Sequence, residues 1–414
     1  MSTETLSNGV PPVQIDLADG RRIQGFVDEG YGAIVDTFRA NFLERRDLGA
    51  ACSVYVTDRL VVDLWGGLAD RKTQRKWEAE TAAVIFSCSK GLLAICTYLL
   101  AQDGRLNLDA PIASYWPEFG QNSKQSITVR CALSHRAGLP ALDVDLSRAD
   151  VVGWEPVVRA IESQEPLWAP DTTHSYHPIT YGWLIGELIR RITGHTPGVY
   201  FRQALGDPLR LHTWIGLPAE ARDSVAWMET PLPDEDSPAA RATATMLAEN
   251  RVAQRSLNMG GAFGFPTQDG IVSFNDPALQ AAEIPAANGI STARSLARLY
   301  AGCISAIDGP QLLTAQSIDD AIVVRSRGQQ RFGGPDDGAR WGTGFQLSSP
   351  PYTPMLGARS FGHAGAGGQL AFGDDEYSVG FSYLSNQMGG YGDARARQLT
   401  SALSRCFVGH ARER

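Results

Sequence analysis

The sequence predicts an α+β protein with two lobes, in which a mainly helical lobe is inserted into an antiparallel sheet flanked by helices. Paired strands with short turns occur near both ends of the chain, whereas from about residue 84 to about residue 285 helical periodicity replaces the strand pattern. A length of 414 residues also exceeds that of one compact core. We therefore expect one lobe from residues 1–84 and 286–414, a second from residues 85–285, and an active site between them.

The N-terminal part is predicted to form a helix and a hairpin after a polar leader. Residues 30–47 carry apolar side chains at the spacing of one helix face. Residues 51–67 have the pattern of two strands around the turn Thr57-Asp58-Arg59.

The C-terminal part is predicted to have the same kinds of element. Residues 367–386 predict a second hairpin that bends at Gly373-Asp374-Asp375, and residues 394–407 predict a terminal helix. The similarity of the two ends favours their association in one lobe.

The middle of the chain is predicted to be helical. Helical periodicity is clear in residues 89–104, 151–164 and 180–194, and the first and last of these segments end at a glycine. Because the pattern of strands fades here, we expect these helices to build the inserted lobe.

A stretch rich in Pro, Gly, Asp and Ala covers residues 231–285. It carries Met259, Phe263, Phe265 and Phe274, which favour either a long loop that lines a pocket or a surface excursion held to the lobe by its aromatic side chains. The sequence leaves these two interpretations open.

Composition excludes several classes of protein. The formal net charge is −8 with acidic and basic residues interspersed, which is not the pattern of a nucleic-acid-binding protein. The N-terminus lacks the features of a secretion signal, no apolar run of about 18 residues occurs, and the six cysteines form no C-x-x-C pair. These features predict a soluble, cytoplasmic protein with reduced cysteines that acts on a small molecule, without nucleic acid or membrane as a partner. They leave the oligomeric state open.

Ser87 and Lys90 are the first candidate catalytic residues. They lie three residues apart at the start of a predicted helix, so both side chains are expected on one face. An amine in a partly dry site can remove the proton of a serine hydroxyl and make it a nucleophile. The first turn also carries the positive end of the helix dipole, which disfavours a cation by roughly 0.3–1 kcal/mol and makes lysine a poor structural choice there. The alternative is an ordinary N-cap serine followed by a solvated lysine.

Tyr176 is the second candidate. It lies just before a strong helical segment, and Pro178 is expected to keep the preceding backbone extended. A phenol close to an ammonium group favours the phenolate, so Tyr176 is a candidate to share the proton of Ser87 with Lys90 and to pass it to the leaving group. The alternative is an aromatic side chain packed beneath a loop.

The third candidate segment begins at His363. Small residues follow it and lead into an apolar strand, which allows close approach of a substrate to the backbone. Backbone N–H groups of this segment are candidates to bind an oxyanion. The alternative is a plain glycine-rich turn.

Other chemistries find less support in the sequence. A G-x-S-x-G elbow, a Walker loop and a dinucleotide fingerprint are absent. His174 and His177 lie three residues apart but have no evident third ligand, so no metal site is predicted. His135 is interpreted as structural. No metal or organic cofactor is expected.

The order Ser-x-x-Lys, Tyr, His-Ala-Gly resembles the serine β-lactamase and penicillin-binding protein family, and most closely its class VIII carboxylesterases. The resemblance extends from about residue 30 to about residue 410. It implies the β-lactamase/transpeptidase-like fold, Ser87 as a nucleophile that acts with Lys90, and Tyr176 as the residue of the tyrosine motif.

The same resemblance implies the third motif and the oxyanion hole. His363-Ala364-Gly365 matches the third motif, and the backbone amides of Ser87 and Ala366 are implied as oxyanion donors. Two departures from the β-lactamase pattern occur, because Pro178 replaces an asparagine and His363 replaces a lysine. Both lost groups serve β-lactams in that family, so the sequence favours a serine esterase that acts on small carboxylic esters through an acyl-enzyme. A β-lactamase-like amidase or D-amino-acid peptidase, an acyltransferase and a non-catalytic binding protein are the alternatives.

Overall fold

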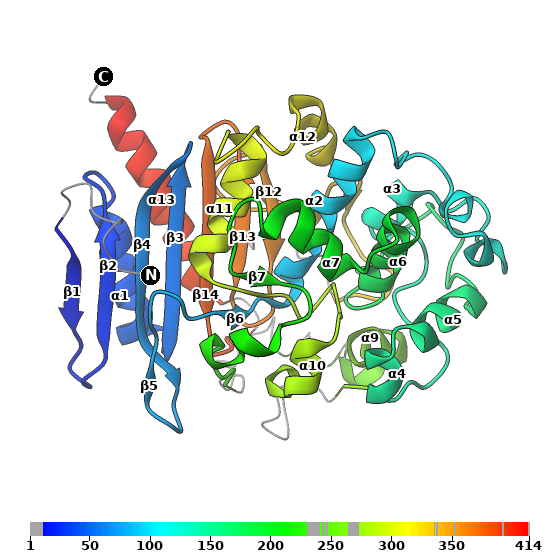
Figure 1. Cartoon of the computed structure of the whole chain (residues 1–414), viewed down its shortest axis with the longest axis horizontal. Helices are drawn as coiled ribbons and strands as arrows, with labels where there is room; N and C mark the ends of the chain where they lie inside the picture. Colours follow the sequence, from blue (N-terminus) through cyan, green and yellow to red (C-terminus); the bar gives the residue numbers. More distant parts are fainter. Residues whose placement is uncertain are drawn as a thin grey trace.

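The large antiparallel sheet is the main feature of the structure. The computed structural model describes residues 11–229, 241, 245, 247–263, 273–334, 336, 338–351, 353–390 and 393–412. In this part of the chain, helices cover both faces of the sheet, and a mainly helical region lies beside it (Figure 1). The predicted fold class, an antiparallel sheet with flanking helices, is confirmed.

The sheet joins strands from both ends of the chain. Its described residues form eleven strands, and β3 pairs antiparallel with β4 on one side and with β14 on the other. In order across the sheet the strands are β1 (Val13–Asp16), β2 (Arg22–Val27), β4 (Arg59–Asp70), β3 (Gly49–Val56), β14 (Val379–Ser385), β13 (Leu370–Asp374), β12 (Ser360–Ala364), β11 (Gln346–Leu347), β10 (Arg340–Trp341) and β9 (Ser326–Arg327), and β5 (Arg75–Lys76) pairs with β4.

Two helices from opposite ends of the chain cover one face of the sheet. They are α1 (Gly32–Glu44) and α13 (Arg395–Arg412). Ile34 and Phe38 of α1 and Leu399 and Leu403 of α13 belong to one buried hydrophobic cluster with Val54 of β3. Burial of these apolar side chains fastens both helices to the sheet.

The other face is covered by α11 (Ala293–Ile304). Ala297 and Ala301 of this helix pack on Tyr55 of β3. Because helices cover both faces, β3 is buried from Gly49 to Tyr55 and reads as a continuous run of small and apolar residues, without the alternation of a half-exposed strand.

The helical region is built around α2 (Ser89–Gln102). Eleven of its fourteen residues are buried, which agrees with a helix that is apolar on all sides. The other helices in the part of the chain that the structure describes are α3 (Val129–Leu133), α4 (Arg148–Val152), α5 (Glu155–Ser163), α6 (Tyr181–Thr193), α7 (Pro197–Phe201), α9 (Arg251–Asn258), α10 (Pro277–Ala281) and α12 (Ala315–Ala321). Shorter helical turns there are η1 (Phe86–Cys88), η2 (Ile112–Ser114), η3 (Pro117–Gly120), η4 (Arg202–Gly206), η5 (Ala219–Ser224), η6 (Met259–Gly261) and η7 (Ser273–Asn275).

A small second sheet connects the two regions. It consists of β6 (Ala83–Val84), β8 (Ile290–Ser291) and β7 (Thr213–Trp214), with β8 in the middle. Strand β6 leads directly into η1 and α2, so this sheet fixes the entry to the segment that carries Ser87.

The predicted polar leader is partly wrong. Residues 13–27 form the hairpin of β1 and β2, which pairs with β4 at the edge of the sheet. The residues of β1 are alternately half-buried and exposed, so the strand has too little apolar character to be recognised from sequence.

The predicted helix at residues 151–164 is two helices, α4 and α5. Trp154 separates them with a left-handed backbone (φ 61°), and its indole Nε1 donates a 2.9 Å hydrogen bond to Glu187 Oε2. Its ring packs on Trp183 at a centroid distance of 5.4 Å. This tertiary contact overrides the helical periodicity.

The hairpins at residues 51–67 and 367–386 are found as predicted, with one shift. The bend of the second hairpin begins after Asp374, because Asp374 Oδ2 accepts a 2.6 Å hydrogen bond from Ser360 of the neighbouring strand. Its Oδ1 accepts the N–H groups of Glu376 and Tyr377 and so closes the turn.

Part of the stretch at residues 231–285 lies against the segment that carries Ser87. Phe274 contacts Phe86 edge to face at a centroid distance of 5.6 Å, and Phe263 packs on Phe274 at 5.8 Å. Phe265 lies outside the described residues.

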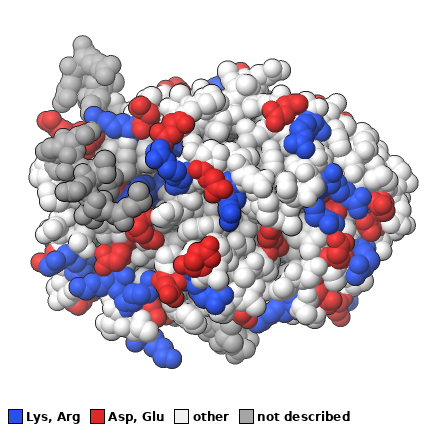
Figure 2. Space-filling view, in the orientation of Figure 1, with Lys and Arg blue, Asp and Glu red and all other residues white. Residues whose placement is uncertain are grey.

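The surface is of mixed charge. Figure 2 shows acidic and basic side chains interspersed over the visible face. In the described part of the chain, no helix has the length and hydropathy needed to cross a membrane. All six cysteines lie in the described part of the chain, are buried and form no disulfide there.

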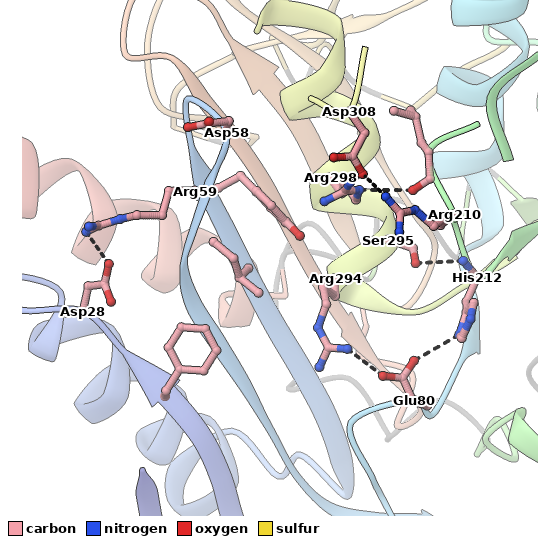
Figure 3. A pocket seen from close by; sticks show the side chains of 14 residues that line it. Asp28, Asp58, Arg59, Glu80, Arg210, His212, Arg294, Ser295, Arg298 and Asp308 are labelled. Atoms are coloured by element: carbon pink, nitrogen blue, oxygen red, sulfur yellow. Dashed lines mark hydrogen bonds and ion pairs between the residues drawn. The ribbon is translucent and has the colours of Figure 1, made fainter. Parts of the chain in front are cut away.

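A charged cavity of about 580 Å³ lies between the sheet, α11 and residues 209–212 (Figure 3). Each of the four arginines that line it pairs with a carboxylate: Arg59 with Asp28, Arg210 and Arg298 with Asp308, and Arg294 with Glu80, which also contacts His212. The pairs that involve Asp308 and Glu80 link residues 210–212, just before β7, to α11. Ser87, Lys90 and Tyr176 do not line this cavity.

Candidate active site

Ser87 lies in η1, immediately before α2. Phe86, the preceding residue, has a left-handed backbone (φ 45°), which is uncommon for a bulky side chain. The hydroxyl of Ser89 donates a 2.5 Å hydrogen bond to the carbonyl of Phe86, and it accepts one of 2.9 Å from the N–H of Gly289, the residue before β8. The bend that presents Ser87 is therefore fixed from both sides.

Lys90 lies one helical turn after Ser87 and is completely buried. Its Nζ lies 3.2 Å from Ser87 Oγ, and it donates hydrogen bonds of 2.6 Å to the carbonyl of Pro178 and 3.0 Å to the carbonyl of Ala286. Burial lowers the pKa of Lys90 well below its usual value of 10.5. The structure thus brings the two residues of the Ser-x-x-Lys pattern together, with an amine that favours its neutral form.

Tyr176 reaches the same oxygen from the other side. Its hydroxyl donates a 2.9 Å hydrogen bond to Ser87 Oγ, and its backbone N–H donates one of 2.8 Å to Gln330 Oε1. Its ring stacks on Trp341 at a centroid distance of 5.9 Å. Lys90 Nζ lies 4.9 Å from the centroid of this ring.

The electrostatics of Tyr176 differ from the expectation. Burial raises the pKa of Tyr176 above its usual value of 10, and burial also favours the uncharged form of Lys90. Both directions disfavour a phenolate while Lys90 is neutral, and the expected role of Tyr176 in sharing the proton of Ser87 with Lys90 stays a prediction. Tyr176 is a neutral hydrogen-bond donor to Ser87.

His363 lies in β12 and is buried at 4% exposure. Its Nδ1 lies 2.6 Å from the carbonyl of Ala364, which only accepts hydrogen bonds, so Nδ1 carries the proton. Burial is the main cause that lowers the pKa of His363 to about 3. Nε2 has no hydrogen-bond partner among the described residues and is left as a bare acceptor.

Gly365 and Ala366 follow β12 in a turn beside the segment that carries Ser87. A side chain at Gly365 would meet the carbonyl of Ile85 at 2.5 Å, and the thiol of Cys88 donates a 3.0 Å hydrogen bond to the carbonyl of His363. Ala366 lies at the exposed tip of this turn. The N–H of Ser87 lies in the first turn of a helix, where backbone N–H groups lack intrahelical partners.

The other histidines near the site serve as hydrogen-bond acceptors for the backbone. His135 Nδ1 accepts the N–H of His177 at 3.2 Å, and His177 Nε2 accepts the N–H of Leu139 at 3.1 Å. Burial lowers the pKa of both rings, in the case of His177 to about 3. Across the described residues, no group of three or more His, Cys, Asp or Glu side chains is arranged to hold a metal ion.

Several contributors were not predicted. The carbonyls of Pro178 and Ala286 hold the amine of Lys90, and the centroid of the Tyr181 ring lies 5.8 Å from Lys90 Nζ. Backbone acceptors have no sequence signature, since every residue carries a carbonyl. Tyr181 had a signal in its position at the start of the helix that follows Tyr176.

Comparison with known proteins gives a consistent result. The family model described as Beta-lactamase matches residues 33–404. The chain is 34% identical to "Esterase/beta-lactamase LipL" of Mycobacterium tuberculosis over 89% of this chain and 84% of that protein. Among solved structures, a penicillin-binding protein homologue from Caulobacter crescentus is 32% identical with a TM-score of 0.79, over 93% of this chain and 99% of that one. A family VIII carboxylesterase is 29% identical with a TM-score of 0.81, over the same shares.

Proposed function

Since this chain belongs to the beta-lactamase family, we propose that it is a serine hydrolase that cleaves small carboxylic esters through an acyl-enzyme on Ser87. One observation carries the proposal: Ser87 Oγ lies within hydrogen-bond reach of both Lys90 Nζ, at 3.2 Å, and the Tyr176 hydroxyl, at 2.9 Å. A nucleophile beside two groups able to move its proton is the arrangement that acyl transfer requires. The esterases among its relatives support ester hydrolysis.

The hydrogen bonds of Lys90 support its role as the base in acylation. A neutral amine has two N–H donors and one lone pair. The carbonyls of Pro178 and Ala286 accept the two donors, which leaves the lone pair for the hydroxyl proton of Ser87. Ser87 Oγ then attacks the ester carbonyl, its proton passes to Lys90, and the amides of Ser87 and Ala366 bind the oxyanion.

Tyr176 is proposed as the acid for the leaving group. Its raised pKa keeps it protonated at neutral pH, and its hydroxyl faces the oxygen of Ser87. When the bond between the carbonyl carbon and the alcohol oxygen breaks, the alkoxide takes the phenolic proton, which the ammonium of Lys90 replaces. In deacylation, water gives a proton to the neutral amine of Lys90 as it attacks the acyl carbon. When the bond to Ser87 Oγ breaks, Ser87 takes the phenolic proton of Tyr176 and the ammonium of Lys90 returns a proton to Tyr176, so the acid is released and the three groups regain their starting state.

Two features favour esters over β-lactams. Pro178 offers no side-chain amide, and His363 is uncharged above its pKa of about 3, so His363 offers no cation to a substrate carboxylate. An ester needs only an acyl pocket, an oxyanion hole and a departing alcohol. Hydrolysis of nitrocefin beside p-nitrophenyl esters measures the balance between the two activities.

Replacement of Ser87 by alanine tests the proposal. Ser87→Ala removes the nucleophile, and we expect turnover of p-nitrophenyl butyrate to fall by at least about a thousandfold, as in other enzymes that lose a covalent nucleophile. Mass spectrometry of the wild type during turnover should detect an acyl adduct on Ser87.

Ser134→Ala is the matched control. Ser134 is buried, and its hydroxyl donates to backbone carbonyls of its own helix, those of Arg130 and Cys131. We expect this variant to keep its activity. Near wild-type turnover by folded Ser87→Ala would refute the assignment of the nucleophile.

A further inference from the structure

The turn that carries Ala366 has almost no side chains to hold it. It runs from Gly365 to Gly368, and three of its four residues are glycine. Gly367 and Gly368 have left-handed backbones, with φ of 83° and 102°. Glycine pays the largest entropic cost of ordering, so groups outside the turn must fix its conformation.

One side of the turn is anchored to the nucleophile segment. The N–H of Gly365 donates to the carbonyl of Gln369 at 2.8 Å. The buried amide of Gln369 then donates to the carbonyl of Val84 at 3.2 Å and to that of Ser385 at 3.1 Å. Val84 belongs to β6, which leads to Ser87, so this anchor couples the two predicted oxyanion amides.

The other side of the turn is held by Arg395 at the start of α13. Its guanidinium Nη2 donates a 2.7 Å hydrogen bond to the carbonyl of Gly367, which also accepts the N–H of Gly389 at 3.0 Å. Arg395 is only 2% exposed, so this charge-assisted bond is shielded from water.

Arg395 is itself held on two sides. Its Nη1 donates to Asp47 Oδ1 at 2.5 Å, and its Nε and Nη2 contact the carboxylate of Asp393. Asp47 also accepts hydrogen bonds from Tyr383 at 2.6 Å and Ser385 at 2.9 Å. The buried charge is therefore balanced without the bond to Gly367, and that bond is an additional use of the guanidinium.

The fit between the turn and this cluster is close. A side chain at Gly368 would lie 2.5 Å from Asp393 Oδ2 and 3.0 Å from Arg395 Nη2. The backbone of the turn thus rests directly on the two charged groups, and movement of the guanidinium would be transmitted to it.

We propose that Arg395 is a positioning residue, which holds the Gly365–Gly368 turn through the carbonyl of Gly367 so that the N–H of Ala366 stays directed at the oxyanion. This proposal rests on the esterase function proposed above. Oxyanion donors act on the transition state, so a displaced turn lowers kcat and leaves substrate binding unchanged.

Arg395→Lys is the variant that tests it. Lysine keeps a positive charge beside Asp47 but has no planar fork with which to reach Gly367 as well. Loss of a whole oxyanion donor costs about 100- to 1000-fold in kcat, so a displaced donor should cost about 10- to 100-fold, with KM changed by less than about twofold. The inhibition constant of phenylboronic acid, whose tetrahedral adduct places an oxygen at the oxyanion position, should rise by the same factor as kcat falls.

Tyr383→Phe is the matched control. It removes a hydrogen bond from the same carboxylate, Asp47, without touching the turn. It should lower the melting temperature but leave kcat and boronate affinity unchanged. Asp393→Asn weakens the ion pair between Asp393 and the guanidinium of Arg395. It should lower kcat by a smaller factor, again with KM unchanged. This variant replaces Arg395→Lys in the test if Arg395→Lys does not fold.

The outcomes separate this proposal from the function on which it rests. Equal kcat losses in Arg395→Lys and Tyr383→Phe, or a loss confined to KM, would overturn the positioning role and leave the esterase assignment intact. Full activity of Ser87→Ala would instead remove the proposed function itself.

Discussion

The amine of Lys90 has oxygen neighbours but, within the described residues, no carboxylate at ion-pair distance. Its neighbours are the hydroxyl of Ser87 and the carbonyls of Pro178 and Ala286. The dipoles of one hydroxyl and two carbonyls do not replace the hydration that an ammonium group loses on complete burial. Desolvation is therefore the main cause of the lowered pKa of Lys90. A lysine in these surroundings is a free base at a pH where an exposed lysine is an ammonium ion.

The dependence of activity on pH follows from this state. The proposed mechanism needs neutral Lys90, so kcat/KM should fall as the pH drops through the lowered pKa of Lys90, and this acid limb should lie well below pH 10.5. Tyr176 keeps its proton beyond its usual pKa of 10, and His363 protonates only near pH 3. We therefore expect a plateau from the acid limb to about pH 10, measured with p-nitrophenyl butyrate and corrected for spontaneous hydrolysis.

His363→Gln is the control for this profile. Glutamine does not titrate in this range, so the variant should keep the acid limb at the same pH even if its rate differs. If the acid limb of the pH profile disappears in His363→Gln, the limb reports the titration of His363, and the proposed role of Lys90 is contradicted.

At the scale of single residues, the sequence predicted the candidate catalytic side chains but not the groups that hold them in place. Ser87 and Lys90 could be paired because helix geometry relates residues three apart. Their contact with Tyr176 depends on a fold that places residues 89 positions apart together, and only the order of motifs pointed to it. The carbonyls that orient Lys90 left no trace in the sequence. Catalytic roles for all of these residues stay predictions.

Helix α2, which carries Lys90, makes one close contact that can be tested by substitution. A methyl group at Gly91 would lie 2.1 Å from the hydroxyl oxygen of Tyr300 in α11. That hydroxyl is buried and has no hydrogen-bond partner in the described part of the chain. A glycine next to Lys90 therefore lets α2 and α11 approach each other closely.

Gly91→Ala should destabilise the protein despite the higher helix propensity of alanine. Overpacking of this kind costs about 1–3 kcal/mol, against a gain of up to about 1 kcal/mol from propensity. Urea unfolding should show a net loss in the free energy of unfolding.

Tyr300→Phe supplies the matched partner for that test. It removes the oxygen that the methyl group meets and leaves Cζ, at 3.2 Å, as the nearest atom. Alone it should be neutral or stabilising, because it deletes an unpartnered buried hydroxyl. Combined with Gly91→Ala it should restore stability, and strictly additive effects would contradict the steric explanation.

Elements were predictable where local pattern decides and not where tertiary contacts do. The helices around Ser87 and Tyr181 and both hairpins have clear periodicity. The break between α4 and α5 follows from the contact of Trp154 with Trp183 and Glu187, which no local window contains. The hairpin of β1 and β2 is too polar to be distinguished from a leader.

At the scale of the whole molecule, Arg294 joins the sheet to the segment that leads to Ser87. It donates hydrogen bonds of 2.6 and 2.9 Å to the buried carboxylate of Asp63 in β4, and it pairs at 2.6 Å with Glu80, shortly before β6 (Figure 3). Desolvation raises the pKa of Asp63, and Arg294 opposes this rise. The buried charge thus depends on Arg294.

Arg294→Gln should therefore destabilise the protein by about 3–5 kcal/mol at neutral pH, because it leaves Asp63 buried without its cation. A carboxyl whose pKa is raised on folding stabilises fully below its unfolded value of 3.8, and this stability is lost as the pH rises through the folded pKa. The deficit of the variant should then shrink as the pH is lowered towards 4, as measured by chemical unfolding at several pH values.

The double variant Arg294→Gln with Asp63→Asn checks the cause. It removes the uncompensated charge and should recover most of the loss at neutral pH. A deficit that is equal in the single and double variants, or independent of pH, would mean that the ion pair is not its source.

At this scale the fold class was predictable and the strand order was not. Two hairpins and an inserted helical segment indicate an antiparallel sheet with a helical insertion, but nothing in either hairpin specifies that β3 and β14 are neighbours. That choice depends on complementary apolar faces across the whole molecule. The residue limits of the two lobes stay a prediction.

The pairing of β3 with β14 sets the order of events during synthesis. The N–H of Gly49 donates a hydrogen bond to Oδ1 of Asn386, which lies 337 positions further along the chain. The central strand pair of the sheet therefore cannot form until β14 has left the ribosome. The helical insertion can fold in the meantime. In the incomplete sheet, β3 is an unpaired edge strand that can pair with another chain and aggregate. Newly made chains are thus expected to depend on chaperones over most of their length, and stalling before β14 should yield aggregates.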